Sequence, residues 1–136
     1  MELVITLFLN TIRMIESTNC QNTNHKVITS GIHKNMQAKG CYGIMPNTYK
    51  ELKKRFPEMK YKLVYVKGKD PVVYNQEVLA RYLAKHLYKK TGGDVTAMAA
   101  GWFYGHNKSK ESLQSYNNST YVNKFKSHYF TSLAGN

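Results

Sequence analysis

The sequence contains little of what would give it a covalent or membrane-embedded scaffold. Its 136 residues include 2 Cys and 3 Pro, and at most one disulfide can form, which excludes a disulfide-rich toxin. The apolar run Leu3–Leu9 is far shorter than the roughly 20 residues of a membrane span, which excludes a channel. Acidic residues are also scarce, 8 against 20 Lys and Arg, so the net charge is +12. No internal repeat or low-complexity segment is present.

The residues that are present fit one folded globular domain over residues 1–136. Hydrophobic residues make up 42% of the chain and aromatic residues 12%. The positive charge favours polyanionic partners, which include nucleic acid, an anionic membrane and a cell-wall polymer. Glu2 rather than a basic segment precedes the apolar run, and no small-residue cleavage site follows. We therefore expect no signal peptide, so an extracellular role would need another route out of the cell.

Apolar periodicity predicts a mainly α fold. Ile5, Leu9, Ile12 and Glu16 lie on one stripe of a helix over residues 2–18. The other expected helices are 48–56 with Asn47 as its cap, 71–90, a small-residue helix after Asp94, and 119–130. A small hairpin within 19–40 and a short strand over 61–67 would supply a minor β element. The expected class is mainly α (α+β).

Glu16 is the main candidate for chemistry. Its carboxyl group continues an apolar stripe, and desolvation favours the neutral form of a carboxyl group. The negative end of the helix dipole acts in the same direction. A glutamic acid that stays protonated near neutral pH is able to act as a general acid. A solvated glutamate at a frayed helix end is the alternative.

Four segments in order then support a family resemblance. They are Glu16-Ser17, Gly40-Cys41-Tyr42-Gly43-Ile44-Met45-Pro46-Asn47-Thr48, Gly92-Gly93-Asp94 to Ala99-Ala100-Gly101-Trp102-Phe103-Tyr104-Gly105, and Tyr121-Val122-Asn123-Lys124. Between the second and the third, Asp70-Pro71 leads into a helix with Ala80, Tyr82 and Leu83. Together they resemble the catalytic domain of lysozyme-like lytic transglycosylases of the soluble (SLT) type. The resemblance implies a lysozyme-like domain that cleaves the β-1,4 bond between N-acetylmuramic acid and N-acetylglucosamine, with Glu16 as catalytic acid.

The same resemblance implies a set of substrate-binding residues. These are Ser17, Tyr42, Gly43, Ile44, Met45, Trp102 and Tyr121. A helix C-cap is the alternative role of Ser17, and core packing is the alternative for Met45 and Trp102. Tyr121 would orient the carboxyl group of the acid through its hydroxyl. The family's Met-Gln is Tyr42-Gly43 here, and its Tyr-Asn is Trp102-Phe103.

The remaining acids provide no evident second carboxylate. Glu51, Glu58, Glu77 and Glu111 lie in exposed-looking, polar or Lys-rich stretches. A lytic transglycosylase needs only Glu16, which protonates the leaving oxygen and then deprotonates the sugar's own 6-hydroxyl, giving a 1,6-anhydro end. Hydrolysis by a muramidase with the same acid is the runner-up, and it needs a second carboxylate or a positioned water.

Cofactors and metals are not expected. The five histidines, which are His25, His33, His86, His106 and His128, lack metal-type spacing and are expected to be solvated in loops. Cys20 and Cys41 flank the candidate site segments, and a disulfide between them depends on an oxidising compartment.

A basic nucleic-acid binder is the competing class, because eleven Tyr interleave with Lys. No zinc, RNP or recognition-helix pattern accompanies them. A catalytically idle structural protein is a third class, against which the presence of Glu16-Ser17 argues. We expect peptidoglycan strands as partner, and no nucleic acid or membrane span. A phage lysis or virion-associated enzyme, or a secretion-apparatus accessory, fits the small size. Such an enzyme would reside in the virion or host cytoplasm and act in the periplasm or cell wall.

Overall fold

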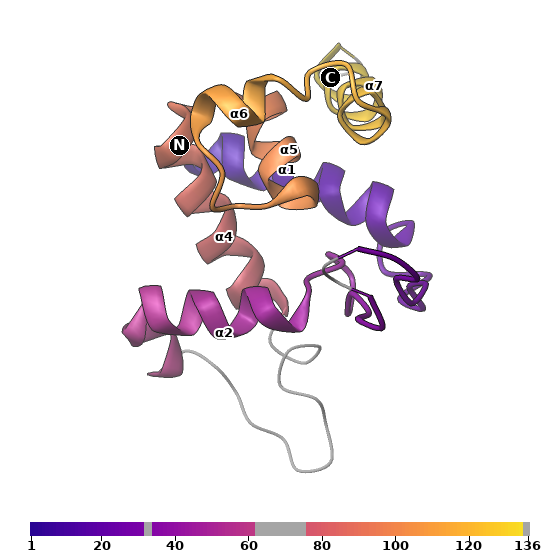
Figure 1. The fold of residues 1–136 in the computed structure, drawn as a ribbon. Helices are drawn as coiled ribbons and strands as arrows, with labels where there is room; N and C mark the ends of the chain where they lie inside the picture. The colour runs from indigo at the N-terminus through magenta and orange to yellow at the C-terminus, as the bar shows by residue number, and fades with distance from the viewer. Residues whose placement is uncertain (32–33, 62–75, 135–136) are drawn as a thin grey trace.

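The computed structural model describes residues 1–31, 34–61 and 76–134, and it is mainly helical, as predicted (Figure 1). The described elements in chain order are α1 (Glu2–Ser17), α2 (Pro46–Arg55), the 3₁₀ helix η1 (Pro57–Tyr61), α4 (Gln76–Thr91), α5 (Val95–Tyr104), α6 (Lys110–Gln114) and α7 (Thr120–Ala134). The predicted strand beyond Tyr61, the first five residues of the predicted helix 71–90, and His33 lie outside the described residues.

Helix α1 forms as its periodicity predicts. The apolar stripe of Ile5, Phe8, Leu9 and Ile12 is buried, so the helix is held mainly by core packing. The helix ends at Thr18, which adopts a left-handed conformation with φ of 50°. Its N–H bonds back to carbonyls of the last turn. Glu16 therefore lies in the last turn of a helix whose stripe faces the core.

Helix α5 is the central helix of the described residues. It packs against α4, α6 and α7, while α1 contacts α4 and α7. Its small residues Ala97–Gly101 are buried, and a Cβ on Gly101 would lie 2.5 Å from Leu87 of α4. Close approach of the helices therefore requires a small residue there. Asp94 accepts hydrogen bonds from the N–H groups of Thr96 and Ala97, as expected of an N-cap.

Two helix boundaries and one short helix differ from the sequence-based expectation. Helix α2 begins at Pro46, whose fixed φ suits the first helical position, so Asn47 is inside the helix rather than its cap. Helix α7 continues to Ala134 instead of ending at Phe130. The five-residue helix α6 was not predicted, because it is too short to show apolar periodicity.

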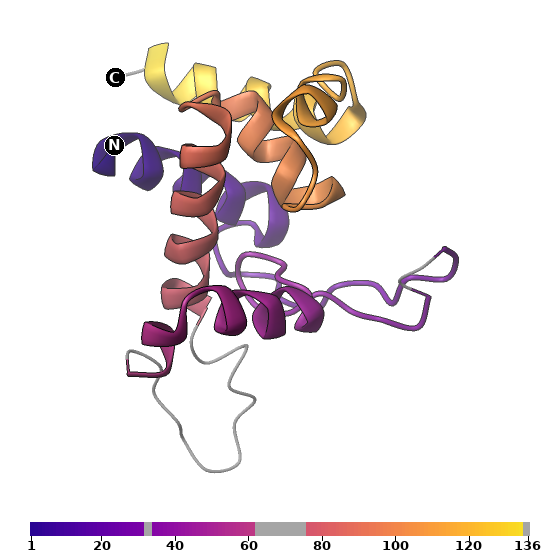
Figure 2. The same ribbon diagram turned by 60° about the vertical axis from the view of Figure 1, so that its left-hand side comes forward.

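The minor β element is smaller than predicted. Among the described residues it consists of an isolated antiparallel bridge between Lys39 and Ile44. Nearby, the N–H of Ile28 bonds the carbonyl of Met36 at 2.9 Å, which closes a narrow loop rather than a strand pair. This polar connection between α1 and α2 extends away from the helices (Figure 2). None of the described helices is both long enough and apolar enough to cross a bilayer.

Candidate active site

A cleft of about 800 Å³ lies where α1 ends, α2 begins and α5 ends. Residues from segments far apart in the sequence line it, among them Glu16, Gly43, Met45, Glu51, Trp102 and Phe103. A cleft of this volume falls in the range typical of ligand sites. The fold thus brings three of the four segments that carry the family resemblance to one cavity. Tyr121 of the fourth segment is not among the lining residues, but it contacts Glu16 and Phe103, which are.

The carboxyl group of Glu16 is partly buried at the wall of this cleft. Desolvation raises its pKa above the usual value and is the largest influence on it. The Tyr121 hydroxyl donates a hydrogen bond to Glu16 Oε1 at 2.9 Å, which lowers the pKa in part, as do the charges of His25 and Lys124. Glu16 is therefore not the freely solvated glutamate of a frayed helix end.

Gly43 faces the other carboxylate oxygen of Glu16. Its φ is +62°, a left-handed conformation that favours glycine. A Cβ added there would lie 2.9 Å from Glu16 Cδ and still closer to Oε2. The absence of a side chain at position 43 therefore lets the backbone approach the acid, and no other residue type does so without displacing it.

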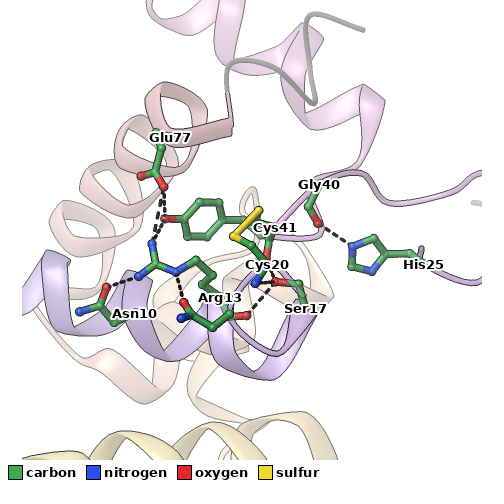
Figure 3. Close-up of a disulfide and its surroundings, with 10 residues drawn as sticks. Asn10, Arg13, Ser17, Cys20, His25, Gly40, Cys41 and Glu77 are labelled. Carbon is green, nitrogen blue, oxygen red and sulfur yellow. Dashed lines mark hydrogen bonds and ion pairs between the residues drawn. A yellow bond between two sulfur atoms is a disulfide. The ribbon is translucent and has the colours of Figure 1, made fainter. Parts of the chain in front are cut away.

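Ser17 and the two cysteines hold the loop that carries Gly43. The Ser17 hydroxyl lies 2.7 Å from the Cys41 carbonyl oxygen and accepts a hydrogen bond from the Cys20 N–H at 2.9 Å. Cys20 and Cys41 form a disulfide, with a Cα–Cα distance of 4.7 Å (Figure 3). Ser17 is 2% exposed and is not among the residues that line the cleft. Its position fits the helix-end alternative better than contact with a substrate.

Tyr42 and Ile44 are buried and are not among the residues that line the cleft, so the prediction that their side chains bind the substrate is wrong. The Tyr42 hydroxyl accepts from Arg13 at 3.0 Å and donates to Glu77 at 2.8 Å, which ties the loop to α1 and α4. Desolvation and the neighbouring Glu77 carboxylate raise the pKa of Tyr42 to about 12, so it stays protonated. These two residues position Gly43 rather than meet a ligand.

Trp102 and Met45 line the cleft, and Trp102 also belongs to the packed wall. Its indole N–H donates to the Tyr42 carbonyl at 2.9 Å, and its ring packs edge-on against Phe8 at 5.7 Å. The indole N–H of Trp102 is thus already hydrogen-bonded within the protein. Both the predicted cleft position and the alternative of core packing apply to this side chain.

Sequence reasoning missed a polar group at the far side of the cleft. Glu51 lines it, and the carboxylate lies 2.8 Å from His106 Nε2 and 3.0 Å from the Asn107 amide. Glu51 is exposed, as expected from the sequence, but it also lines the cleft, which the sequence analysis did not foresee. Thr48, Glu51 and Arg55 lie on one face of α2 at spacings of three and four residues. This polar face was the sequence pattern that could have indicated a role for Glu51.

The expectation of solvated loop histidines is wrong for His106, which is buried, and for His86, which lies half-buried in α4. His106 is 7% exposed, and burial lowers its pKa although Glu51 acts in the opposite direction. Burial likewise lowers the pKa of the half-buried His86 to about 4. His25 lies 2.7 Å from the Gly40 carbonyl oxygen (Figure 3). Within the described ranges, no three His, Cys, Asp or Glu side chains gather as a metal-binding group.

No family model, curated protein or solved structure matches this chain. The resemblance to lytic transglycosylases therefore rests on the four segments of the sequence. The structure adds that Glu16 at the cleft is held between the Tyr121 hydroxyl and the backbone of Gly43.

Proposed function

We propose that the protein is a peptidoglycan lytic transglycosylase with Glu16 as its general acid and base. The observation that supports this most directly is the desolvated Glu16 carboxyl group at the wall of the 800 Å³ cleft, held between Tyr121 and Gly43. Desolvation raises the pKa of Glu16 and so favours its protonated form, while the Tyr121 hydrogen bond stabilises the carboxylate once the proton has left. A group balanced in this way suits both donation and acceptance of a proton.

The proposed reaction uses one carboxyl group twice. Glu16 gives its proton to the glycosidic oxygen as the bond from that oxygen to the anomeric carbon of N-acetylmuramic acid breaks. The departing N-acetylglucosamine leaves as an alcohol. The Glu16 carboxylate then takes the proton of the 6-hydroxyl while that oxygen bonds the anomeric carbon. The product is a 1,6-anhydro ring, no water is consumed, and Glu16 is protonated again.

Hydrolysis by a muramidase is the second candidate, and Glu51 is the observation in its favour. It is a second carboxylate on the same cleft, which a hydrolase needs to activate water. Its oxygen is engaged by His106 and Asn107, however, and these contacts join α2 to the loop after α5. That arrangement favours a role in fixing the cleft wall, so we place transglycosylation first.

The charge of the cleft suits a wall polymer. Lys26 and Lys108 line it, and the chain carries a net charge of +12, so carboxylates on the substrate are attracted. A disulfide between Cys20 and Cys41 fits a site of action in an oxidising compartment such as the periplasm. We propose accordingly that the protein opens the wall as part of a phage lysis system, a virion or a secretion apparatus.

Glu16→Gln tests the assignment of the acid. The amide keeps the size of the side chain and its oxygen still accepts from Tyr121, but it supplies no proton. We expect lysis of purified peptidoglycan to fall by about 10²–10⁴-fold, the range for loss of a general acid. Glu51→Gln separates the two candidate reactions, because it should retain most of the lytic rate if Glu51 only fixes the cleft wall and should lose it if Glu51 activates water. Near-normal lysis by Glu16→Gln would contradict the assignment.

The thermal unfolding midpoint of Glu16→Gln tests whether the variant remains folded. Because burial raises the folded-state pKa of Glu16, its carboxyl group stabilises the fold in the protonated state and loses this contribution as pH rises through that pKa. The neutral amide avoids this loss. Glu16→Gln should therefore unfold at the same or a higher temperature than the original chain at neutral pH.

A further inference from the structure

Phe103 is an aromatic ring exposed on the wall of the cleft. It is 58% exposed, although the neighbouring residues of α5 from Ala97 to Gly101 are buried. Exposed single apolar residues are common on surfaces, but this one lines the cavity that contains Glu16. In the family motif an Asn stands at this position, so the resemblance assigns no role to an aromatic ring here.

The ring of Phe103 packs against Tyr121, the residue that hydrogen-bonds Glu16. It stacks on Tyr121 with centroids 4.3 Å apart and planes inclined by 16°. Tyr104 meets it edge-on at 5.0 Å. Tyr121 in turn donates its hydroxyl hydrogen bond to Glu16 at 2.9 Å. Phe103 thus presents a flat apolar ring that is backed by Tyr121, and Tyr121 also contacts the Glu16 carboxyl group.

We propose that Phe103, supported by Tyr121, is a stacking subsite for the apolar face of a pyranose ring. This inference rests on the proposed function and names how that site holds its glycan. The axial C–H groups of a β-linked N-acetylhexosamine form an apolar face that matches an aromatic ring. Trp102 and Tyr104 also line the cleft. Trp102 packs against Phe8 and donates its indole N–H to the Tyr42 carbonyl, and Tyr104 stacks on Tyr116 with ring centroids 4.0 Å apart. The Phe103 ring forms no hydrogen bond, and more of its surface is exposed than that of Trp102.

The subsite also relates binding to the position of the acid. A sugar stacked on Phe103 presses the ring toward Tyr121, which fixes the Glu16 carboxyl group through its hydroxyl. Loss of the platform therefore should affect substrate affinity first, and the proton transfer only through the placement of the sugar.

Binding of a β-1,4-linked N-acetylglucosamine hexamer tests the proposal, with all variants made in the Glu16→Gln background so that the ligand stays intact. The emission of Trp102, the only Trp in the chain and a residue of the cleft, reports the binding. Covering the exposed part of a Phe ring corresponds to about a tenfold change in Kd. We expect Phe103→Ala to weaken binding about tenfold, and Phe103→Tyr to restore it.

Phe130→Ala is the matched control. Phe130 is 47% exposed on α7 and is not among the residues that line the cleft, so its removal should leave the Kd unchanged. Thermal unfolding of each variant shows that it is folded. An unchanged Kd in Phe103→Ala, an equal loss in Phe130→Ala, or no binding of the hexamer to the Glu16→Gln protein would each overturn the subsite. Persistent lysis by Glu16→Gln would instead overturn the proposed function, so the two failures are distinct.

Discussion

Substituting Gly43 by Ala should have two effects that can be measured separately: a loss of fold stability and a displacement of the Glu16 carboxyl group. At φ of +62° an alanine costs about 1–2 kcal/mol, because its Cβ crowds the backbone in the left-handed region. In a domain of this size that corresponds to a fall in the unfolding midpoint of about 2–8 °C. This part of the effect is a property of the loop and does not depend on catalysis.

The new methyl group adds a second effect at Glu16. It would lie 2.9 Å from Cδ and closer to Oε2, where ordinary contact begins at 3.4 Å. The carboxyl group must therefore move away, and the 2.9 Å hydrogen bond from Tyr121 constrains where it goes. Misplacing a catalytic group by about 1 Å costs about 10²-fold in rate. We expect the rate of peptidoglycan lysis to fall by about that factor.

Gly31→Ala is the matched control for this experiment. Gly31 has φ of +84°, so the backbone cost is similar, yet a Cβ there meets nothing within 4 Å. Both variants should lose similar thermal stability, while Gly43→Ala alone should lose activity. Equal lytic rates for the two variants would refute the claim that Gly43 is needed for the approach to Glu16.

Two further predictions concern the groups around the acid. Tyr121→Phe removes the hydrogen bond that lowers the pKa of Glu16, so the pKa should rise further and the alkaline limb of the pH–rate profile should move to higher pH. An unmoved limb would show that Glu16 is not the group that titrates in it. Replacing both Cys20 and Cys41 by Ser, which removes the disulfide across 21 residues, should lower the free energy of unfolding by about 3 kcal/mol in chemical denaturation. An unchanged unfolding midpoint would show that the disulfide does not brace the loop.

The helices that could be predicted from the sequence are those whose signals are local. The stripe of Ile5, Leu9 and Ile12 defines α1 and places Glu16 in its last turn. Asp94 identifies the start of α5 because capping depends on residues three positions away. Helix α6 was missed, since its single buried residue, Leu113, leaves no periodic pattern.

The parts of the site that could not be predicted depend on contacts between distant segments. Ser17 was expected at the substrate, but the loop containing Cys41 folds over it and buries it. The position of Glu51 on the cleft could not be predicted, because its partner His106 lies 55 positions further along the chain. The stacking of Phe103 in α5 on Tyr121 in α7 likewise joins segments that are separate in the sequence. The sequence names the residue types, whereas the tertiary fold decides which of them reach the cleft.

Mass spectrometry of the fragments released from purified peptidoglycan, with Glu16→Gln run in parallel, tests whether Glu16 catalyses transglycosylation. We expect muropeptides whose N-acetylmuramoyl ends are lighter by one water, and their absence with Glu16→Gln. Ordinary reducing ends would contradict transglycosylation and point to hydrolysis with Glu51 as the second carboxylate. Release of the same fragments by Glu16→Gln would contradict the role of Glu16 itself.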